Sequence, residues 1–511
     1  MTFVTGMLRC FLYILLPVGL AWVGSRSLSM MFSAGSEQER QPLLLRPETT
    51  DPLSYDWERI LRQEGSTSYS YESARIEANN PRSTNGKTND VAVHAIVLVH
   101  GWLGNPLEMD SISQSLRHAI ATNDVQDEDQ ESQTLRVEHR FVVHSVLCNE
   151  GKTTDGIDAG GTRLAAEINS LLRYIVDMNL DASSVSLSIV GNSLGGLYAR
   201  RALPEIEWNL TTTTSTKQHQ SNAKSISVVP MLFVTTATPH LGVSSHTYVK
   251  LPRFAEYPIA TVLQQTGKDL FRFSSVLEEL TFEDKYLQPL ARFRKRIAYA
   301  NVCGTDFQVP TATASFLALE SDSPHQVVVS TAIDDDDKTS TPDSIVMTLE
   351  TSQGQLESLQ DHQARQELDP TKRYQEWSKQ LDRLGWTKVL VDMREHIPQL
   401  SIFSSSRSDS SSASSDDSSK GSNKENNTRR NISCKSSNSG YNEKETWTSD
   451  ELLKEFGSGL LERTTGESNE DLGTIRKFFS PPQLRFPLGH TVMVANAKDE
   501  VSSTKRSGLI D

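Results

Sequence analysis

One serine stands in a spacing of glycines that can support nucleophilic chemistry. Ser193 occupies the centre of Gly191-Asn192-Ser193-Leu194-Gly195, which has the pattern G-x-S-x-G. In this pattern a nucleophilic serine sits on a sharp turn between a strand and a helix. The pattern alone is weak evidence, because 28 glycines in 511 residues make a chance occurrence ordinary. The alternative interpretation is a glycine-rich turn without catalytic function.

The neighbouring residues favour the catalytic interpretation. The apolar run 185–190 predicts a strand that leads directly into Gly191, and residues 194–203 predict a helix. Gly191 and Gly195 would let that strand and helix approach each other closely around a strained serine. The hydroxyl of Ser193 would then stand above the edge of a sheet, where it can attack a carbonyl carbon.

The negative oxygen that forms on an attacked carbonyl needs hydrogen-bond donors. One donor in this kind of turn is the backbone N–H of the residue after the nucleophile, here Leu194. A second comes from a loop after an earlier strand, and the run 100–104 (His-Gly-Trp-Leu-Gly) ends such a strand. We therefore predict the Trp102 N–H as the second donor, with His100 and Gly101 as the motif that positions it. His100 and His240 are expected to orient loops rather than to take protons.

Apolar runs typical of strands alternate with helical patterns along the chain. Strands are predicted at 91–101, 140–146, 185–190, 228–236, 296–302 and 386–393, and helices at 106–121, 163–178 and 194–203. This alternation predicts an α/β fold, with a mostly parallel central sheet and helices on both faces. Residues 243–295 are helical in pattern and suit a cap over an active site. Weaker signals indicate a helix near Tyr55–Arg62 and a strand at 326–331.

Five short motifs together resemble a known family. They are His100–Gly104, the stretch from Cys148 to Leu164, Gly191–Gly196, Thr238–Gly242 and Thr266–Lys268. Their residues and order resemble the DUF676 serine esterases, and plant and algal members most closely. The resemblance covers 90–310, 380–396 and 486–496, and is interrupted by insertions at 122–136, 209–224, 320–370 and 400–480. It implies an α/β-hydrolase fold and an esterase or lipase acting on acylglycerols or phospholipids.

A serine nucleophile of this fold needs an acid and then a histidine later in the chain. Asp306 follows the predicted strand 296–302 and is the candidate acid, although an exposed turn aspartate is the alternative interpretation. Asp269 is the next candidate, within the expected cap. The base is one of four later histidines: His325, His362, His396 and His490. His490 precedes an apolar run that resembles the family's C-terminal histidine segment, and His396, which directly follows the last predicted strand, is second.

Composition excludes some classes of protein. A formal net charge of −14 argues against a nucleic acid partner, because phosphate backbones bind basic surfaces. Four cysteines form neither a disulfide framework nor a paired metal-ligand spacing, and Cys148 and Cys303 suit buried positions. The chemistry proposed for Ser193 needs no metal or cofactor. The partners expected are a lipid or other acyl-ester substrate and a membrane surface or lipid droplet.

The domain organisation follows from changes in composition. The apolar segment near the N-terminus predicts targeting or a signal anchor, with entry to the secretory pathway or endoplasmic reticulum membrane, or a plastid or mitochondrial route. An apolar fraction of 36% and a serine-rich run at 404–438 predict disorder. The segments expected are targeting at 1–36, a polar linker at 37–90, the hydrolase domain at 91–400, a mostly disordered insertion at 401–480 and the C-terminal part of the hydrolase at 481–500.

Two other functions remain open at this point. One is a catalytically inactive hydrolase fold that binds lipid or serves as a scaffold, which an intact nucleophile and oxyanion motif disfavour. The other is a hydrolase of non-lipid acyl groups, such as a protein deacylase. Only the substrate profile distinguishes the second from a lipase.

Overall fold

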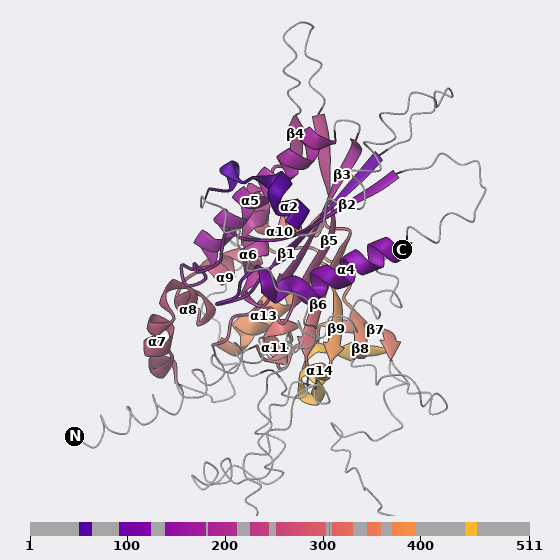
Figure 1. Cartoon of the computed structure of the whole chain (residues 1–511). Helices are drawn as coiled ribbons and strands as arrows, with labels where there is room; N and C mark the ends of the chain where they lie inside the picture. Colours follow the sequence, from indigo (N-terminus) through magenta and orange to yellow (C-terminus); the bar gives the residue numbers. More distant parts are fainter. Residues whose placement is uncertain are drawn as a thin grey trace, which may run out of the picture.

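The computed structural model describes a core of the chain with gaps. The described residues are 51–63, 91–123, 138–179, 182–211, 225–244, 252–302, 306, 309–330, 345–358, 370–393 and 445–456. Within them, one ten-stranded sheet forms the centre of the molecule (Figure 1). Its order is β10-β7-β8-β9-β6-β5-β3-β1-β2, and β4 pairs with β5 beside this path.

Six neighbouring strands of this sheet run parallel to one another. They are β2 (Glu138–Ser145), β1 (Val91–Val99), β3 (Ala182–Asn192), β5 (Ser225–Thr236), β6 (Lys295–Asn301) and β9 (Thr387–Val391). All six were predicted from apolar runs. Such runs are what a parallel strand requires, because helices cover both of its faces.

The alternating side chains of β1 show how the two faces are covered. Val93, Val97 and every second side chain between Val91 and Val99 join one core with helices α5 (Ile157–Met178) and α6 (Leu194–Ala202). Leu98 points to the opposite face, where it packs with Ile112 of α4 (Asp110–Asn123). Each such buried aliphatic side chain contributes about 1.5–3 kcal/mol through removal of apolar surface from water.

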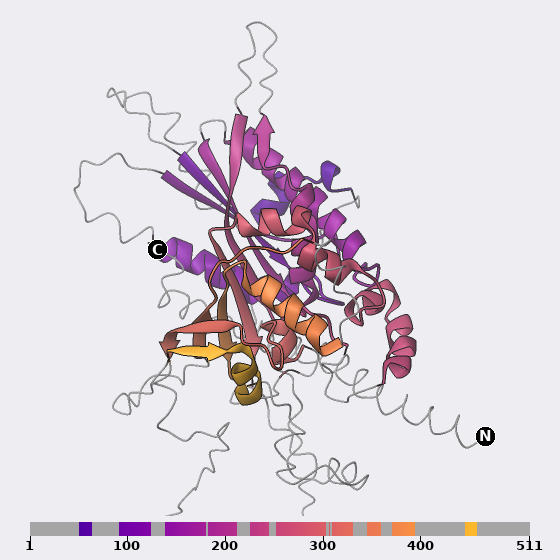
Figure 2. The ribbon, with the colours of Figure 1, turned by 180° about the vertical axis from the view of Figure 1, so that it is seen from behind.

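The far half of the sheet is covered on both faces as well. Helix α13 (Pro370–Asp382) joins the α5 and α6 face through Trp377 and Leu381. Figure 2 shows α13 lying over the sheet when the molecule is seen from behind. Helices α11 (Thr311–Ala314) and α14 (Ser449–Phe456) pack on the other face against β6, β8 and β9. The strand order, the parallel core and the two helical layers are those of an α/β-hydrolase fold.

The described residues between 252 and 295 are mostly helical, as predicted for 243–295, but they do not form one separate layer. The segment contains α7 (Arg253–Val262), α8 (Gln264–Leu270), α9 (Val276–Phe282) and α10 (Asp284–Ala291). Helices α9 and α10 contribute buried side chains to the core that α5 and α6 share. Helices α7 and α8 pack on each other at the side of the molecule (Figure 1).

Several described elements were not predicted from the sequence. Strand β8 (Ile345–Glu350) pairs antiparallel with β9 and lies inside the expected acidic insertion. Strand β10 (Thr446–Thr448) and α14 lie inside the segment expected to be mostly disordered, and they pack on the rest of the domain. Strand β7 (Pro324–Ser330), which was predicted, joins β8 and β10 into an antiparallel extension of the sheet.

Part of the expected linker at 37–90 belongs to the core. The predicted helix there is α2 (Trp57–Gln63), which follows the short turn η2 (Pro52–Ser54). Trp57 is 5% exposed, and its Nε1 donates a hydrogen bond of 2.8 Å to Ser170 Oγ on α5. The remaining short elements are η3 (Pro106–Met109), η5 (Leu203–Glu205) and β4 (Asn209–Thr211).

The predicted targeting segment 1–36 and the predicted C-terminal segment 481–500 lie outside the described residues. Cys303 also lies outside them, whereas Cys148 is described and buried, as expected. Among the helices that the structure describes, none combines the length and the apolar character needed to cross a membrane.

Candidate active site

Ser193 sits on a turn that most residues avoid. It lies between β3 and α6 with φ of +52° and ψ of −123°, in the left-handed half of the backbone map. A residue with a side chain adopts such a conformation at a cost of roughly 1–3 kcal/mol, and this strain is typical of functional sites. The turn is held by the Ser193 N–H, which donates a 2.8 Å hydrogen bond to the Thr236 carbonyl.

The flanking glycines are required by close packing of backbone on backbone. A methyl group on Gly191 would lie 2.5 Å from the Gly196 Cα, and one on Gly195 would lie 2.3 Å from the Val99 carbonyl oxygen. Both distances are far below van der Waals contact. These distances agree with the close approach of strand and helix that was expected at Gly191 and Gly195.

The loop after β1 reaches the nucleophile. A methyl group on Gly101 would lie 2.9 Å from the Ser193 Cβ, so the two chain segments are in contact. Leu103 has a positive φ of 55°, and its N–H donates to Thr153 Oγ1 at 2.9 Å. The Gly104 N–H donates to the Gly101 carbonyl at 3.2 Å, which closes the turn.

One N–H group of this loop, that of Trp102, has no acceptor among the described residues. The Gly101 N–H donates to Glu108 Oε1 at 3.0 Å. The N–H groups of Leu103 and Gly104 donate to Thr153 Oγ1 and to the Gly101 carbonyl. Among the described residues, none accepts a hydrogen bond from the N–H of Trp102 or of Leu194. These are the two donors that the sequence predicted for an oxyanion.

Glu108 is a functional candidate that the sequence analysis missed. Its Oε1 accepts a 2.6 Å hydrogen bond from Asn192 Nδ2 in addition to the bond from the Gly101 N–H. Asn192 in turn accepts from Thr236 Oγ1 at 2.8 Å. The carboxylate of Glu108 therefore connects the loop after β1 with the turn that carries Ser193.

The candidate acid Asp306 is buried and lies just beyond the end of β6. It is 2% exposed, which excludes the alternative of an exposed turn aspartate. Its Oδ2 accepts from Asn301 Nδ2 at 3.0 Å and its Oδ1 from the Val309 N–H at 2.9 Å. Strand β6 is parallel to β5, so Asp306 leaves the sheet at the same edge as Ser193.

The second candidate acid, Asp269, has a different function. Its Oδ2 accepts from the Ile157 N–H at 2.8 Å, at the first turn of α5. Its Oδ1 accepts from Gln265 Nε2 and Ser274 Oγ at 2.8 and 2.7 Å. An acidic group at a helix N-terminus satisfies orphan N–H groups and favours the helix dipole. Asp269 thus caps α5.

The side chain of His240 makes hydrogen bonds with α6 and β5. It is fully buried, and its Nδ1 accepts from Arg200 at 3.3 Å while its Nε2 donates to Thr235 Oγ1 at 3.1 Å. Burial lowers the pKa of His240 far below its usual range, and the charges of Arg200 and Lys388 lower it further. His100 donates from Nδ1 to the Gly101 carbonyl at 3.1 Å, within the loop that it precedes.

Comparison with known proteins finds a family profile over the part of the chain that holds this site. The family profile described as "Putative serine esterase (DUF676)" matches residues 89–317. That stretch contains Trp102, Ser193 and Asp306. The resemblance inferred from five short motifs is therefore confirmed for the family profile, whereas the relation to plant and algal members stays a prediction.

Two yeast proteins are similar over the same part of the chain. "Putative lipase YDL109C" of Saccharomyces cerevisiae is 30% identical over 231 residues, which are 44% of this chain and 31% of the relative. "Putative lipase ROG1" of the same organism is 29% identical over 239 residues, or 44% of this chain and 29% of the relative. The chain thus spans about a third of the length of these curated relatives. Among solved structures, "The crystal structure of the gene lin2722 products from Listeria innocua" is 12% identical, with a TM-score of 0.22, over 43% of this chain and 76% of that one.

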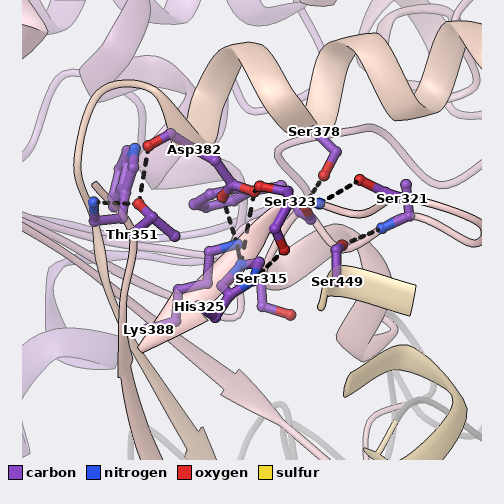
Figure 3. A network of polar contacts seen from close by, with 12 residues as sticks. Ser315, Ser321, Ser323, His325, Thr351, Ser378, Asp382, Lys388 and Ser449 are labelled. Carbon is purple, nitrogen blue, oxygen red and sulfur yellow. Dashed lines mark hydrogen bonds and ion pairs between the residues drawn. The ribbon is translucent and has the colours of Figure 1, made fainter. Parts of the chain in front are cut away.

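Three of the four candidate bases, His362, His396 and His490, lie outside the described residues. The fourth, His325, is buried in the antiparallel extension of the sheet, where polar contacts surround it (Figure 3). Its Nε2 accepts from Lys388 Nζ at 2.8 Å, and its Nδ1 donates to the Ser323 carbonyl at 3.0 Å. Both ring nitrogens are therefore engaged, and His325 is not the base for Ser193.

The same network holds a fully buried ion pair. Lys388 Nζ lies 2.6 Å from Asp382 Oδ1, and Ser323 Oγ donates to Asp382 Oδ2 at 2.7 Å. Burial by itself raises the pKa of Asp382, but the charge of Lys388, the hydrogen bond and charge of His325 and the hydrogen bond from Lys388 together outweigh it and hold the pKa below its usual value. The pair joins α13 to β9 and β7, so its role is to anchor the extension to the parallel sheet.

Proposed function

We propose that the chain is a serine esterase or lipase that hydrolyses carboxylic ester bonds through an acyl-enzyme on Ser193. The observation that carries this proposal is the strained turn at Ser193 beside a loop whose Trp102 N–H has no acceptor among the described residues. A strained serine and two N–H donors held in place are what acyl transfer requires. No metal or cofactor enters this mechanism.

In the proposed reaction, a histidine takes the proton of the Ser193 hydroxyl as the oxygen attacks the ester carbonyl. The N–H groups of Trp102 and Leu194 stabilise the oxyanion, and the histidine then protonates the leaving alcohol. Water deacylates the serine by the same steps. Asp306 would hold the imidazole in the required tautomer, and its burial beside the end of β6 supports this role.

His490 is the proposed base, with His396 as the second candidate. The placement of β9 supports the second: it pairs in parallel with β6, so the chain after Val391 leaves the sheet at the edge where Asp306 lies. His490→Ala and His396→Ala variants separate the two. Loss of fluorophosphonate labelling in one variant, with wild-type labelling in the other, identifies the base.

A lipid is the proposed substrate class, which the names of the two yeast relatives support. Leu103 and Leu107 also support it, since they are 47% and 55% exposed around the loop that bears Trp102. A membrane surface or lipid droplet would then present the substrate. A deacylase of non-lipid groups would be recognised by turnover of acylated peptides but not of acylglycerol or phospholipid vesicles.

A fluorophosphonate probe tests the chemistry directly, since it phosphonylates an activated serine. We expect labelling of the wild-type chain and none of Ser193→Ala. Equal labelling of both would refute the assignment of the nucleophile. No labelling of a folded wild-type chain would favour the inactive lipid-binding or scaffold alternative.

A further inference from the structure

We propose that Glu108 is a positioning residue that holds the oxyanion loop against the nucleophile turn; the inference rests on the proposed function. Glu108 lies in η3, after the loop, and a single oxygen of its carboxylate serves two chain segments. Its Oε1 accepts from the Gly101 N–H at 3.0 Å and from Asn192 Nδ2 at 2.6 Å. Gly101 follows β1 and Asn192 ends β3, so the carboxylate joins the ends of neighbouring strands.

The packing shows that space is kept for this carboxylate. A methyl group on Gly104 would lie 1.9 Å from Glu108 Oε2, so any side chain at position 104 would displace the carboxylate. A methyl group on Gly101 would lie 3.3 Å from Glu108 Oε1 and 2.9 Å from the Ser193 Cβ. Glu108, both loop glycines and the nucleophile are thus packed against one another.

The connection continues beyond Asn192 to a third strand. Asn192 Oδ1 accepts from Thr236 Oγ1 at 2.8 Å, and the Thr236 carbonyl accepts from the Ser193 N–H at 2.8 Å. A line of hydrogen bonds therefore runs from the loop after β1, through Glu108 and Asn192, to the end of β5. Movement of Glu108 would alter both the loop and the turn.

The hydrogen bond to Gly101 also decides which N–H is available for the oxyanion. Because Glu108 takes the Gly101 N–H, the next peptide is fixed with the Trp102 N–H free of acceptors among the described residues. The negative charge of a carboxylate is unfavourable for a developing oxyanion nearby. Glu108 therefore acts through the position of its acceptor oxygen and not through its charge, and an uncharged glutamine can replace it.

The rate of fluorophosphonate labelling in three variants of the full chain tests this inference. Glu108→Gln keeps the reach of the side chain and removes the charge, and we expect a labelling rate constant within about 3-fold of wild type. Glu108→Asp keeps the charge and shortens the reach, and Glu108→Ala removes both. Each should lose about 10- to 100-fold, because displacement of catalytic groups by about 1 Å costs on the order of 100-fold. Asp110→Asn is the matched control, since Asp110 is an exposed residue whose carboxylate accepts a hydrogen bond from Gln114 of its own helix, and it should label like wild type.

Two further measurements separate positioning from a general loss of structure. Hydrogen exchange of the peptide that spans 100–104 should speed up in Glu108→Ala and stay at the wild-type rate in Glu108→Gln, whether or not the chain is an enzyme. With a soluble p-nitrophenyl ester, Glu108→Ala should lower kcat and leave KM within about 2-fold.

The outcomes for Glu108 and for the proposed function are distinguishable. Wild-type labelling of Glu108→Ala would overturn the inference about Glu108 and leave the nucleophile assignment intact. A variant pattern in which Asp is active and Gln inactive would overturn it as well, because charge and not position would then matter. Failure of the wild-type chain to label would refute the proposed function. Unchanged exchange of 100–104 in Glu108→Ala would then overturn the structural connection too.

Discussion

Replacing Asn192 by aspartate places two carboxylates where the structure has an amide and a carboxylate in contact. In the wild-type chain, Asn192 Nδ2 donates to Glu108 Oε1 at 2.6 Å. An aspartate has no donor at this position, so two negative oxygens would face each other over this distance. The variant tests whether the amide of Asn192 and the carboxylate of Glu108 form one structural unit.

The expected magnitude follows from the distance. Two unit charges separated by 2.6 Å repel by roughly 2 to 6 kcal/mol for effective dielectric constants between 80 and 20. Binding one proton is the alternative, and it costs about 1.4 kcal/mol for each pH unit above the ordinary carboxyl pKa of about 4.3. At pH 7 this amounts to about 4 kcal/mol. The Asn192→Asp variant should therefore lose about 2 to 4 kcal/mol of unfolding free energy at pH 7. The loss arises from charge repulsion or from proton binding, whichever costs less.

The sign of the pH dependence follows from the same competition. Mutual repulsion raises the pKa of the pair in the folded Asn192→Asp variant above the unfolded value. The folded state then binds more protons than the unfolded state, so the stability penalty is absent at pH 4 and grows as pH rises through the raised pKa. Wild type has no such pair. The free energy of unfolding, measured with urea at several pH values, should fall with rising pH in the variant relative to wild type.

A double variant provides the control. Asn192→Asp combined with Glu108→Gln removes one of the two charges, so the pH-dependent part of the lost stability should disappear. Labelling should recover only in part, because the contact with position 192 and the bond from the Gly101 N–H use the same oxygen, Glu108 Oε1. A penalty in Asn192→Asp that does not vary between pH 4 and pH 8, or a double variant no better than the single one, would refute the reasoning.

Three further outcomes follow from buried contacts elsewhere. Lys388→Met leaves Asp382 as an unpaired buried charge and should cost about 3–5 kcal/mol in urea unfolding, and adding Asp382→Asn should recover at least half of that loss. Gly195→Ala places a methyl group 2.3 Å from the Val99 carbonyl and should cost about 1–3 kcal/mol in thermal unfolding and slow probe labelling at least 10-fold. Burial raises the pKa of Glu167, but the hydrogen bond and charge of His144, together with hydrogen bonds from Cys148 and Leu147, outweigh it and hold the pKa below its usual value. Its stabilising contribution is therefore complete above that value and is lost as pH falls through the lowered pKa, so Glu167→Gln should flatten the acid limb of a stability–pH curve.

The parallel core could be predicted because its strands have a local signal. A strand buried on both faces needs a continuous apolar run, and Val91–Val99 or Ser225–Thr236 shows one without reference to the rest of the chain. The antiparallel extension has no such signal. Strand β10 has three residues, and its stability comes from pairing with β7 and from Leu452 and Phe456 of α14 in the core. Composition indicated disorder for the segment that includes 445–456. It could not reveal the order there, because the stabilising contacts join residues that are distant in sequence.

The same difference explains which site residues could be found. Ser193, Leu194 and Trp102 stand in short motifs whose chemistry depends on neighbouring residues. Glu108 was missed because its partner Asn192 is 84 residues away in the chain. The histidine was ranked by position after a strand or before an apolar run, and both candidates, His396 and His490, lie outside the described residues.

One signal for Glu108 was nevertheless present in the sequence. Gly104 has no positive φ, so a turn conformation does not require glycine there. Its lack of a side chain is explained by Glu108 Oε2, which would lie 1.9 Å from a methyl group at that position. Asn192 fills the variable position before the serine because an amide can donate to the carboxylate and accept from Thr236 at once. The residue before the serine, the glycine at 104 and the side-chain oxygen at 108 therefore form one motif. Loss of the donor at 192, of the space at 104 or of the acceptor at 108 should be tolerated only with a matching change at another of these positions.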